Sequence, residues 1–552
     1  MSRASALLAR ACGLPRAQTE DVVREKNLRV TMDDGAVLVA DRWVARATRH
    51  AAQPTVLVRS PYGRRHAVGL VFGRILAERG LQVLVQSVRG TFDSDGRFDP
   101  FDECADGLAT LDWIRAQPWH AERIALLGAS YLGTAMWAAA PGAGNDIAAL
   151  AIQVGPSSAH HATFPGGSTA LETAGSWLAL IDGQDSRVPP LGITRAVARL
   201  PKLFMRLPLG EFDVNATGAE VRWFRTALAS PRRDDPYWAA RDHAPGVSQV
   251  TAPVQLVGGW YDIFLPSMLE DHAARQAAGL ETQLIIGPWA HTSPGLIAAS
   301  LREATAWLRA HVLDDRRLVR PDAIRVRVTG ENIGDGWRSL ENWPPPGIGE
   351  RRLWVAGDGE LLLVEPAAAP GGGDGYRYDP AHPTPAFGGP HLLARLPVID
   401  NRRLELRSDV LTYTTEPLTT AVEAIGVARV ELHVRASEPH FDLFARVCDV
   451  GALGMSRNVC DALTRISPEC FEPAADGSWR VAFDLWPMAH RFAEGHRIRL
   501  QVSSGAHPRY ARNPGTGEDP VTATALRAVD VELLHGAQHP SVLVLPTAAG
   551  PH

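Results

Sequence analysis

The feature that most constrains this fold is a regular alternation between short apolar runs and longer segments with a helical period. The apolar runs occupy residues 55–60, 81–88, 123–127, 147–154, 253–259 and 282–288, and helical patterns at 68–79, 103–117, 131–140 and 266–279 separate them. Strands that are apolar on both sides must be covered on both faces, as in parallel sheets flanked by helices. The sequence therefore predicts an α/β domain around a mainly parallel sheet, with two earlier strands at 27–32 and 36–44.

Two other parts of the chain break this rhythm. Residues 157–247 are rich in Ala, Leu and Arg, lack strand alternation, and indicate an inserted helical cap. After about residue 317, short alternating strands between Gly-, Pro- and Asp-rich loops are typical of an all-β sandwich or jelly roll. The Gly/Pro-rich stretch 365–390 is expected to be a long loop within it. A chain of 552 residues is too long for one core, so several domains are expected.

The amino-acid composition argues against some kinds of binding partner. With 45% apolar and 21% charged residues and a formal net charge of −5, the chain gives no reason to expect nucleic acid or an anionic membrane. It contains no run of about 18 apolar residues that would indicate a transmembrane helix. The apolar stretch near the N-terminus is short and broken by Arg10, unlike a secretory signal, so a cytoplasmic location is expected. Homo-oligomer formation is left open.

The five cysteines do not predict a metal site. Cys12, Cys104, Cys448, Cys460 and Cys470 are few, odd in number and lack the CxxC spacing of zinc ligands. A pair among the last three could meet, but buried free thiols are favoured.

One short motif indicates nucleophilic catalysis. Gly128-Ala129-Ser130-Tyr131-Leu132-Gly133 lies between an apolar run and a helical pattern. A nucleophile elbow has the form G-x-S-x-G, and here the second glycine comes one residue later. The elbow places a serine on a strained strand-to-helix turn, so that its hydroxyl projects at the carboxyl edge of the sheet. The structural alternative is a tight turn without catalytic function.

A serine hydroxyl needs a base and an orienting acid, which in this fold follow the nucleophile as acid and then His. Asp262 and His291 each come just after an apolar run, where strand ends meet at one edge. Asp271 and His272 compete for these roles, but they fall inside a helical pattern. The order and placement predict Ser130, Asp262 and His291 as the catalytic triad.

Two donors are expected to stabilise an oxyanion. The amide of Tyr131 begins the helix after Ser130, and the phenol of Tyr62 follows the run 55–60. For Tyr62 alone, an aromatic packing role explains the residue equally well.

Together these segments resemble the cocaine esterase and X-Pro dipeptidyl-peptidase (CocE/NonD) family of serine hydrolases. The matching segments are RSPYGR (59–64), VRGTFDSDGRF (88–98), GLATLDWIRAQPW (107–119), GASYLG (128–133), GGWYDIF (258–264), GPWAH (287–291), SDVLTYTTEPL (408–418) and SSGAHPRYARNPGTG (503–517).

The resemblance implies an α/β-hydrolase domain formed by residues 1–156 and 248–316, a helical cap at 157–247, and a C-terminal β jelly roll at 317–552. It also implies the same triad and oxyanion donors. The later glycine of the elbow resembles the family's own form of the motif.

The resemblance further implies a small-molecule ester as the substrate. The related α-amino-acid ester hydrolases carry carboxylates just after the triad acid, where this chain has Ile263, Phe264 and Leu265. An apolar or aromatic acyl pocket lined by Phe264 is therefore expected, and Trp177 and Trp223 of the cap are candidates to extend it. The expected reaction proceeds through an acyl-enzyme with no metal and no organic cofactor.

Three other functions remain open at this stage. An X-Pro dipeptidyl aminopeptidase or an amidase would use the same triad, and an acyltransferase would replace water by an alcohol. A non-catalytic binding protein with a hydrolase fold is the alternative from another class.

Overall fold

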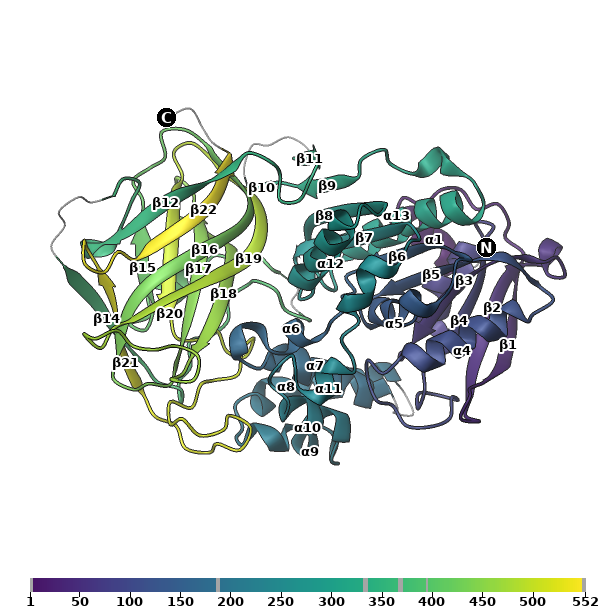
Figure 1. The fold of residues 1–552 in the computed structure, drawn as a ribbon, viewed down its shortest axis with the longest axis horizontal. Helices are drawn as coiled ribbons and strands as arrows, with labels where there is room; N and C mark the ends of the chain where they lie inside the picture. The colour runs from purple at the N-terminus through teal and green to yellow at the C-terminus, as the bar shows by residue number, and fades with distance from the viewer. Residues whose placement is uncertain (1–2, 185–188, 331–335, 366–370, 394–395, 549–552) are drawn as a thin grey trace. The chain divides into compact units, whose positions relative to one another are not determined.

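The computed structural model describes residues 3–184, 189–330, 336–365, 371–393 and 396–548. The chain forms two compact units. Unit 1 comprises residues up to 161 together with 181–193 and 232–325, and unit 2 comprises 162–180, 194–231 and the rest from 326. Figure 1 shows the chain with helices and strands of both units labelled where there is room.

A mainly parallel sheet organises unit 1 (Figure 1). Its strands lie in the order β1-β2-β4-β3-β5-β6-β7-β8, with β9 (Ile324–Arg327) following β8. From β4 to β8 each neighbouring pair is parallel, whereas β1–β2 and β2–β4 are antiparallel. The strands are β1 (Val22–Thr31), β2 (Val37–Ala45), β3 (Gln53–Ser60), β4 (Gln82–Ser87), β5 (His120–Ala129), β6 (Ile147–Gln153), β7 (Val254–Tyr261) and β8 (Thr282–Ala290).

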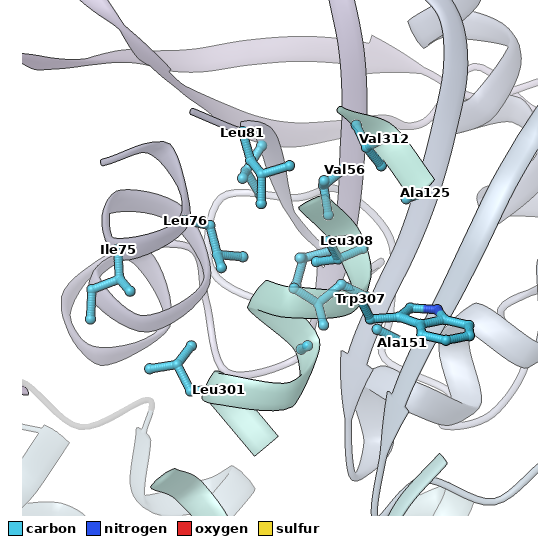
Figure 2. Packing of buried hydrophobic residues seen from close by; sticks show 14 of the residues in the cluster. Val56, Ile75, Leu76, Leu81, Ala125, Ala151, Leu301, Trp307, Leu308 and Val312 are labelled. Carbon is cyan, nitrogen blue, oxygen red and sulfur yellow. The ribbon is translucent and has the colours of Figure 1, made fainter. Parts of the chain in front are cut away.

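Helices cover the faces of this sheet, as the apolar strands require. They are α1 (Arg3–Ala11), α2 (His66–Val68), α3 (Ile75–Ala77), α4 (Cys104–Arg115), α5 (Tyr131–Ala139), α12 (Leu265–Ala277) and α13 (Pro294–Val312). On one face, Trp307 and Leu308 of α13 belong to the same buried cluster as Val56 of β3 and Ala125 of β5 (Figure 2). Successive strand residues alternate in direction, so Val58 joins this cluster while Arg59 reaches α4.

The helical pattern expected at 68–79 is interrupted. A π-helical segment, Gly69–Arg74, lies between α2 and α3. Gly69 and Gly73 lie against the Trp43 ring, so closely that a Cβ at Gly73 would come within 2.5 Å of the indole nitrogen. The glycines therefore allow this segment to approach β2.

The cap segment lies between β6 and β7 in sequence, and its described residues form helices joined by turns and loops, with no strand. Its helices are α6 (His160–Thr163), α7 (Leu171–Gln184), α8 (Pro189–Leu203), α9 (Phe212–Thr217), α10 (Arg222–Leu228) and α11 (Pro236–Ala239). Parts of this segment belong to each unit: residues 181–193 and those from 232 belong to unit 1, and residues 162–180 and 194–231 belong to unit 2. Among the described residues, no helix in the chain has both the length and the apolar character needed to cross a membrane.

The remainder of unit 2 is an all-β domain whose described residues include one short α-helix, α14 (Arg402–Glu405). Most of its strand pairs are antiparallel. Its strands are β10 (Thr329–Gly330), β12 (Ile348–Ala356), β13 (Glu360–Leu362), β14 (Gly372–Tyr378), β15 (Leu411–Thr414), β16 (Val422–Ala436), β17 (Phe441–Val450), β18 (Ser456–Ile466), β19 (Trp479–Phe492), β20 (Arg497–Ser503), β21 (Val529–His535) and β22 (Val542–Ala548). The strand β11 (Trp337–Leu340) instead follows β9 in the other sheet. The predicted fold class, an α/β-hydrolase domain with a helical insertion and a C-terminal β domain, is confirmed.

The expectation of a continuous loop at 365–390 is wrong for part of that stretch. Residues 372–378 form β14, which pairs along its whole length with β21. The high glycine content of this segment led to the expectation of a loop. In the strand, Tyr376 and Tyr378 form the buried face. Residues 366–370 of this stretch lie outside the described residues.

The five cysteines are free thiols. Cys12, Cys448 and Cys460 are buried as expected, but Cys104 and Cys470 are exposed.

Candidate active site

Ser130 occupies a sharp turn between β5 and α5. Its backbone has φ 58° and ψ −131°, a positive-φ conformation that is costly for a residue with a side chain. The strand ends at Ala129 and the helix begins at Tyr131, so the turn consists of Ser130 alone. This is the strand–turn–helix context in which a G-x-S motif forms a nucleophile elbow.

The two flanking glycines are required by close backbone contacts. A Cβ on Gly128 would lie 2.2 Å from the Leu132 carbonyl oxygen. A Cβ on Gly133 would lie 2.9 Å from the Cα of Gly155, in the loop after β6. The second glycine of the motif therefore comes one residue late because α5 meets a neighbouring loop at that position.

Ser130, His291 and Asp262 form a continuous chain of hydrogen bonds. The His291 Nε2 atom lies 2.9 Å from the Ser130 Oγ, and its Nδ1 atom lies 2.5 Å from the Asp262 Oδ2. Asp262 follows β7 and His291 follows β8, so neighbouring parallel strands deliver both to one edge of the sheet. Asp262 is fully buried, which keeps water from competing for its carboxylate.

The second oxygen of Asp262 is also engaged. The Phe264 amide donates a hydrogen bond to Oδ1 at 2.9 Å, so the carboxylate is held at both oxygens. The Phe264 ring meets the His291 imidazole edge-on, with ring centroids 5.4 Å apart. Phe264 therefore contacts Asp262 through its backbone and His291 through its side chain.

Asp271 and His272, the competing candidates, have other surroundings. The Ser157 amide and hydroxyl both donate to the Asp271 carboxylate. Neither ring nitrogen of His272 has a hydrogen-bond partner among the described residues, and burial lowers the pKa of His272 to about 4. The hydrogen-bond chain from Ser130 thus uses Asp262 and His291.

Burial raises the pKa of Asp271 to about 7, against the opposing effect of its Ser157 hydrogen bonds. The unfolded chain ionises Asp271 near about pH 4, so this contribution to stability is present below that pH and is lost as the pH rises towards about 7. Asn at this position imitates the neutral acid. We expect the melting temperature of Asp271→Asn, relative to wild type, to be higher at about pH 8 than at about pH 5. The reason is that only wild type loses free energy of unfolding over this range, by up to about 1.4 kcal/mol per pH unit below the folded-state pKa of about 7. Melting curves of both proteins at the two pH values test this, and parallel shifts would contradict it.

The two expected oxyanion donors lie on different elements. Tyr131 is the first residue of α5, so its amide lies at a helix N-terminus, where backbone N–H groups favour negative charge. Tyr62 follows β3; its amide donates to the Ser60 Oγ, and its side chain packs against the buried cluster that contains Val56. The roles of both residues towards an oxyanion stay predictions.

The cap tryptophans pack against each other. The ring centroids of Trp177 and Trp223 are 5.0 Å apart, and Trp223 also packs on a cluster of Leu and Phe side chains within the helical insertion. A role for them in an acyl pocket stays a prediction.

Sequence reasoning missed two charged residues beside the elbow, Arg59 and Glu103. Glu103 accepts a hydrogen bond from the Tyr131 phenol at 2.5 Å, and Arg59 pairs with Glu103 at 2.7 Å. Glu103 belongs to an acidic run at 99–106 whose pattern resembles an ordinary helix start, so the local sequence carries no sign of this contact.

Comparison with known proteins gives consistent relatives. The model of the X-Pro dipeptidyl-peptidase (S15) family matches residues 34–293, and that of the X-Pro dipeptidyl-peptidase C-terminal non-catalytic domain matches 321–544. A cocaine esterase from Rhodococcus sp. (strain MB1 Bresler) is 30% identical, over 94% of this chain and 98% of that protein.

Two solved structures share the fold over nearly the whole chain. An aminopeptidase from a marine sediment archaeon of the Thaumarchaeota has a TM-score of 0.79 at 21% identity, covering 97% of this chain and 98% of its own. An α-amino acid ester hydrolase has a TM-score of 0.79 at 20% identity, with the same coverage. With matches along both of its parts and a relative of nearly equal length, this chain belongs to the X-Pro dipeptidyl-peptidase (S15) family of hydrolases, as the sequence motifs predicted.

Proposed function

We propose that this chain is a serine hydrolase that cleaves small carboxylic esters with an apolar or aromatic acyl group. The observation that carries the proposal is the hydrogen-bond chain from Ser130 through His291 to Asp262, on a strained strand-to-helix turn. Three side chains in this order are what an unactivated hydroxyl needs to become a nucleophile.

In the acylation half-reaction, the Ser130 Oγ attacks the ester carbonyl carbon while its proton passes to the His291 Nε2. Asp262 accepts from Nδ1, which keeps Nε2 unprotonated before attack and stabilises the imidazolium afterwards. The Tyr131 amide and the Tyr62 phenol stabilise the negative charge that forms on the carbonyl oxygen. The C–O bond then breaks, and His291 gives its proton to the leaving alkoxide.

Deacylation repeats these steps with water as the nucleophile. His291 takes a proton from water, hydroxide adds to the acyl-enzyme, and the Ser130 Oγ leaves with the proton that His291 returns. The products are a carboxylic acid and an alcohol.

Three observations favour an ester with an apolar acyl group. The 30% identical relative is a cocaine esterase, and its similarity extends over both parts of this chain. The three residues after Asp262 are apolar, so this segment offers no carboxylate to pair with a substrate ammonium. The Phe264 ring packs against the His291 imidazole, which makes Phe264 the candidate wall for the acyl group.

The second candidate is an X-Pro dipeptidyl-peptidase or amidase with the same triad. The name of the matched family and the fold shared with an aminopeptidase favour it. Such an enzyme must bind the free amino terminus of its substrate, which calls for an acidic group near the acyl site.

A substrate panel separates the two candidates. We would compare p-nitrophenyl acetate, butyrate and benzoate with the matched p-nitroanilides and an X-Pro p-nitroanilide. The proposal predicts a kcat/KM for the esters far above that for any anilide, with benzoate or butyrate preferred to acetate. Faster cleavage of the X-Pro anilide than of every ester would replace the esterase proposal by the peptidase.

Phe264→Ala tests the acyl pocket. Loss of one aromatic wall removes about 1–3 kcal/mol of contact with an apolar acyl group, a factor of about 10–100 in kcat/KM. Because Phe264 also touches His291, all esters are expected to slow, so the ratio of benzoate to acetate activity is the relevant quantity. We expect that ratio to fall in Phe264→Ala and to recover partly in Phe264→Leu. An unchanged ratio would place the acyl group elsewhere.

A further inference from the structure

Tyr131, whose amide is a predicted oxyanion donor, is anchored by hydrogen bonds to its phenol hydroxyl. Its hydroxyl donates to the Glu103 Oε1 at 2.5 Å and accepts from the Phe101 amide at 3.1 Å. The ring packs against Phe98 and Phe101, with centroids 5.9 and 5.2 Å away. Burial and the nearby Glu103 raise the pKa of Tyr131 well above its usual value, so the phenol keeps its proton and remains a donor.

The other oxygen of Glu103 faces Arg59. The Arg59 Nη1 lies 2.7 Å from the Glu103 Oε2 and also donates to the Glu103 backbone carbonyl. Burial raises the pKa of Glu103, and the positive charge of Arg59 opposes that effect. Both side chains are buried, so this is an ion pair with little competition from water.

Arg59 connects the pair to the other predicted donor. It lies near the end of β3, three residues before Tyr62, and its Nε donates to Gln86 on β4 at 2.8 Å. The segment from Arg59 to Tyr62 is thereby fixed to the sheet and to the start of α4. One carboxylate thus touches the residue after the nucleophile and the strand that leads to Tyr62.

We propose that Glu103 is a positioning residue of the oxyanion hole, which fixes the Tyr131 amide through the Tyr131 phenol and the Tyr62 segment through Arg59. Glu103 does not touch the substrate; it sets where the two donors lie. This inference rests on the proposed serine-hydrolase function. A displacement of about 1 Å at a catalytic group costs about 10²-fold in rate, so a buried anchor at this place has a measurable effect.

Three variants remove different parts of the anchor. Tyr131→Phe keeps the ring contacts and removes the hydrogen bond to Glu103. Glu103→Gln keeps an oxygen that can accept from the phenol but loses the charge that pairs with Arg59, and Glu103→Ala removes both interactions. We expect kcat to fall by about 10–100-fold in Tyr131→Phe and Glu103→Ala, with Glu103→Gln in between wild type and these two, and with KM close to wild type.

An inhibitor that fills the oxyanion hole gives a readout that a loss of stability would not move. An aryl boronic acid forms a tetrahedral adduct with a reactive serine, and one of its oxygens occupies the site of the oxyanion. We expect its Kd to rise by the same factor by which kcat falls, while the Kd of the planar carboxylate product stays unchanged. The matched control is Tyr376→Phe in unit 2, which also removes a buried phenol hydrogen bond, to Ser504 at 2.7 Å. That variant is expected to lower the melting temperature and to leave kcat and boronate affinity unchanged.

The outcomes separate this inference from the proposed function. An active wild type with Tyr131→Phe and Glu103→Gln that retain full kcat and boronate affinity overturns the positioning role alone. A wild type that cleaves no acyl substrate and binds no boronate overturns both. If Glu103→Ala fails to fold, Tyr131→Phe still decides the question, because it leaves the Arg59–Glu103 pair in place.

Discussion

Ser130→Ala is expected to lose activity by a factor on the order of 10⁴–10⁶ in kcat while retaining the fold. The Ser130 Oγ is the end of the hydrogen-bond chain, and no other side chain in that chain can form the acyl-enzyme. The variant still holds His291 and Asp262, so any remaining rate reflects the oxyanion donors and substrate binding. Steady-state hydrolysis of a p-nitrophenyl ester measures the loss, and intact-protein mass after a fluorophosphonate probe measures the missing covalent adduct.

Ser541→Ala is the matched control for that experiment. Ser541 is also a buried serine, but it lies in unit 2, where its hydroxyl donates to the Leu534 carbonyl and accepts from the His433 amide. We expect this variant to lose some stability and to keep both kcat and probe labelling. A Ser130→Ala protein that retains wild-type kcat, or still takes up the probe, would show that another residue is the nucleophile.

Much of the candidate site could be predicted because its residues follow the ends of parallel strands. Each of Ser130, Asp262 and His291 follows an apolar run, and parallel strands end at one edge of a sheet. These residues are far apart in the sequence, but the parallel sheet brings them together. Knowing the order of the strands is therefore enough to predict that they meet. The positive φ of Ser130 was likewise predictable from the motif, because the elbow requires it.

The buried pair Arg59–Glu103 could not be predicted in the same way. Its members lie on β3 and at the start of α4, and nothing in either local segment indicates that they meet. Glu103 lies in an acidic segment of the kind that usually begins a solvent-exposed helix. It is buried because α4 packs on the sheet. Contacts of this kind depend on the angle and depth of helix packing, which hydrophobic periodicity does not specify.

The strand β14 was missed for a different reason. The high glycine content of this segment favoured a loop, although Tyr376 and Tyr378 alternate as in a strand. Glycines at 372, 373 and 375 favour a loop, yet this segment pairs with β21 from Gly372 to Tyr378. His535 and Glu532 of β21 lie over Gly372 and Gly373, where a side chain would collide with them. Crowding across the strand pair therefore accounts for Gly372 and Gly373, whereas a Cβ at Gly375 would meet its nearest neighbour, the Val531 carbonyl oxygen, only at 3.9 Å.

The structure also predicts a large and specific effect for Asp262→Asn. The Asp262 carboxylate accepts from the Phe264 amide at Oδ1 and faces the His291 Nδ1 at Oδ2. An asparagine here must place its oxygen towards the Phe264 amide, because two N–H groups cannot face each other. Its NH₂ group then points at the His291 Nδ1 and donates to it. The imidazole is left with its proton on Nε2, which faces the Ser130 Oγ and can no longer accept the serine proton.

We therefore expect Asp262→Asn to lower kcat by about 10⁴-fold at neutral pH, with little change in KM. Asp271→Asn is the matched control: it is the same substitution at a second buried aspartate of unit 1, which holds Ser157 and not His291, and its kcat should stay near wild type. Hydrolysis rates of the two variants, measured side by side, test the assignment. Comparable losses in both would mean that the effect comes from disturbing buried carboxylates in general. A loss confined to Asp262→Asn means that the proton position on His291 limits the reaction, because the two substitutions differ in that respect.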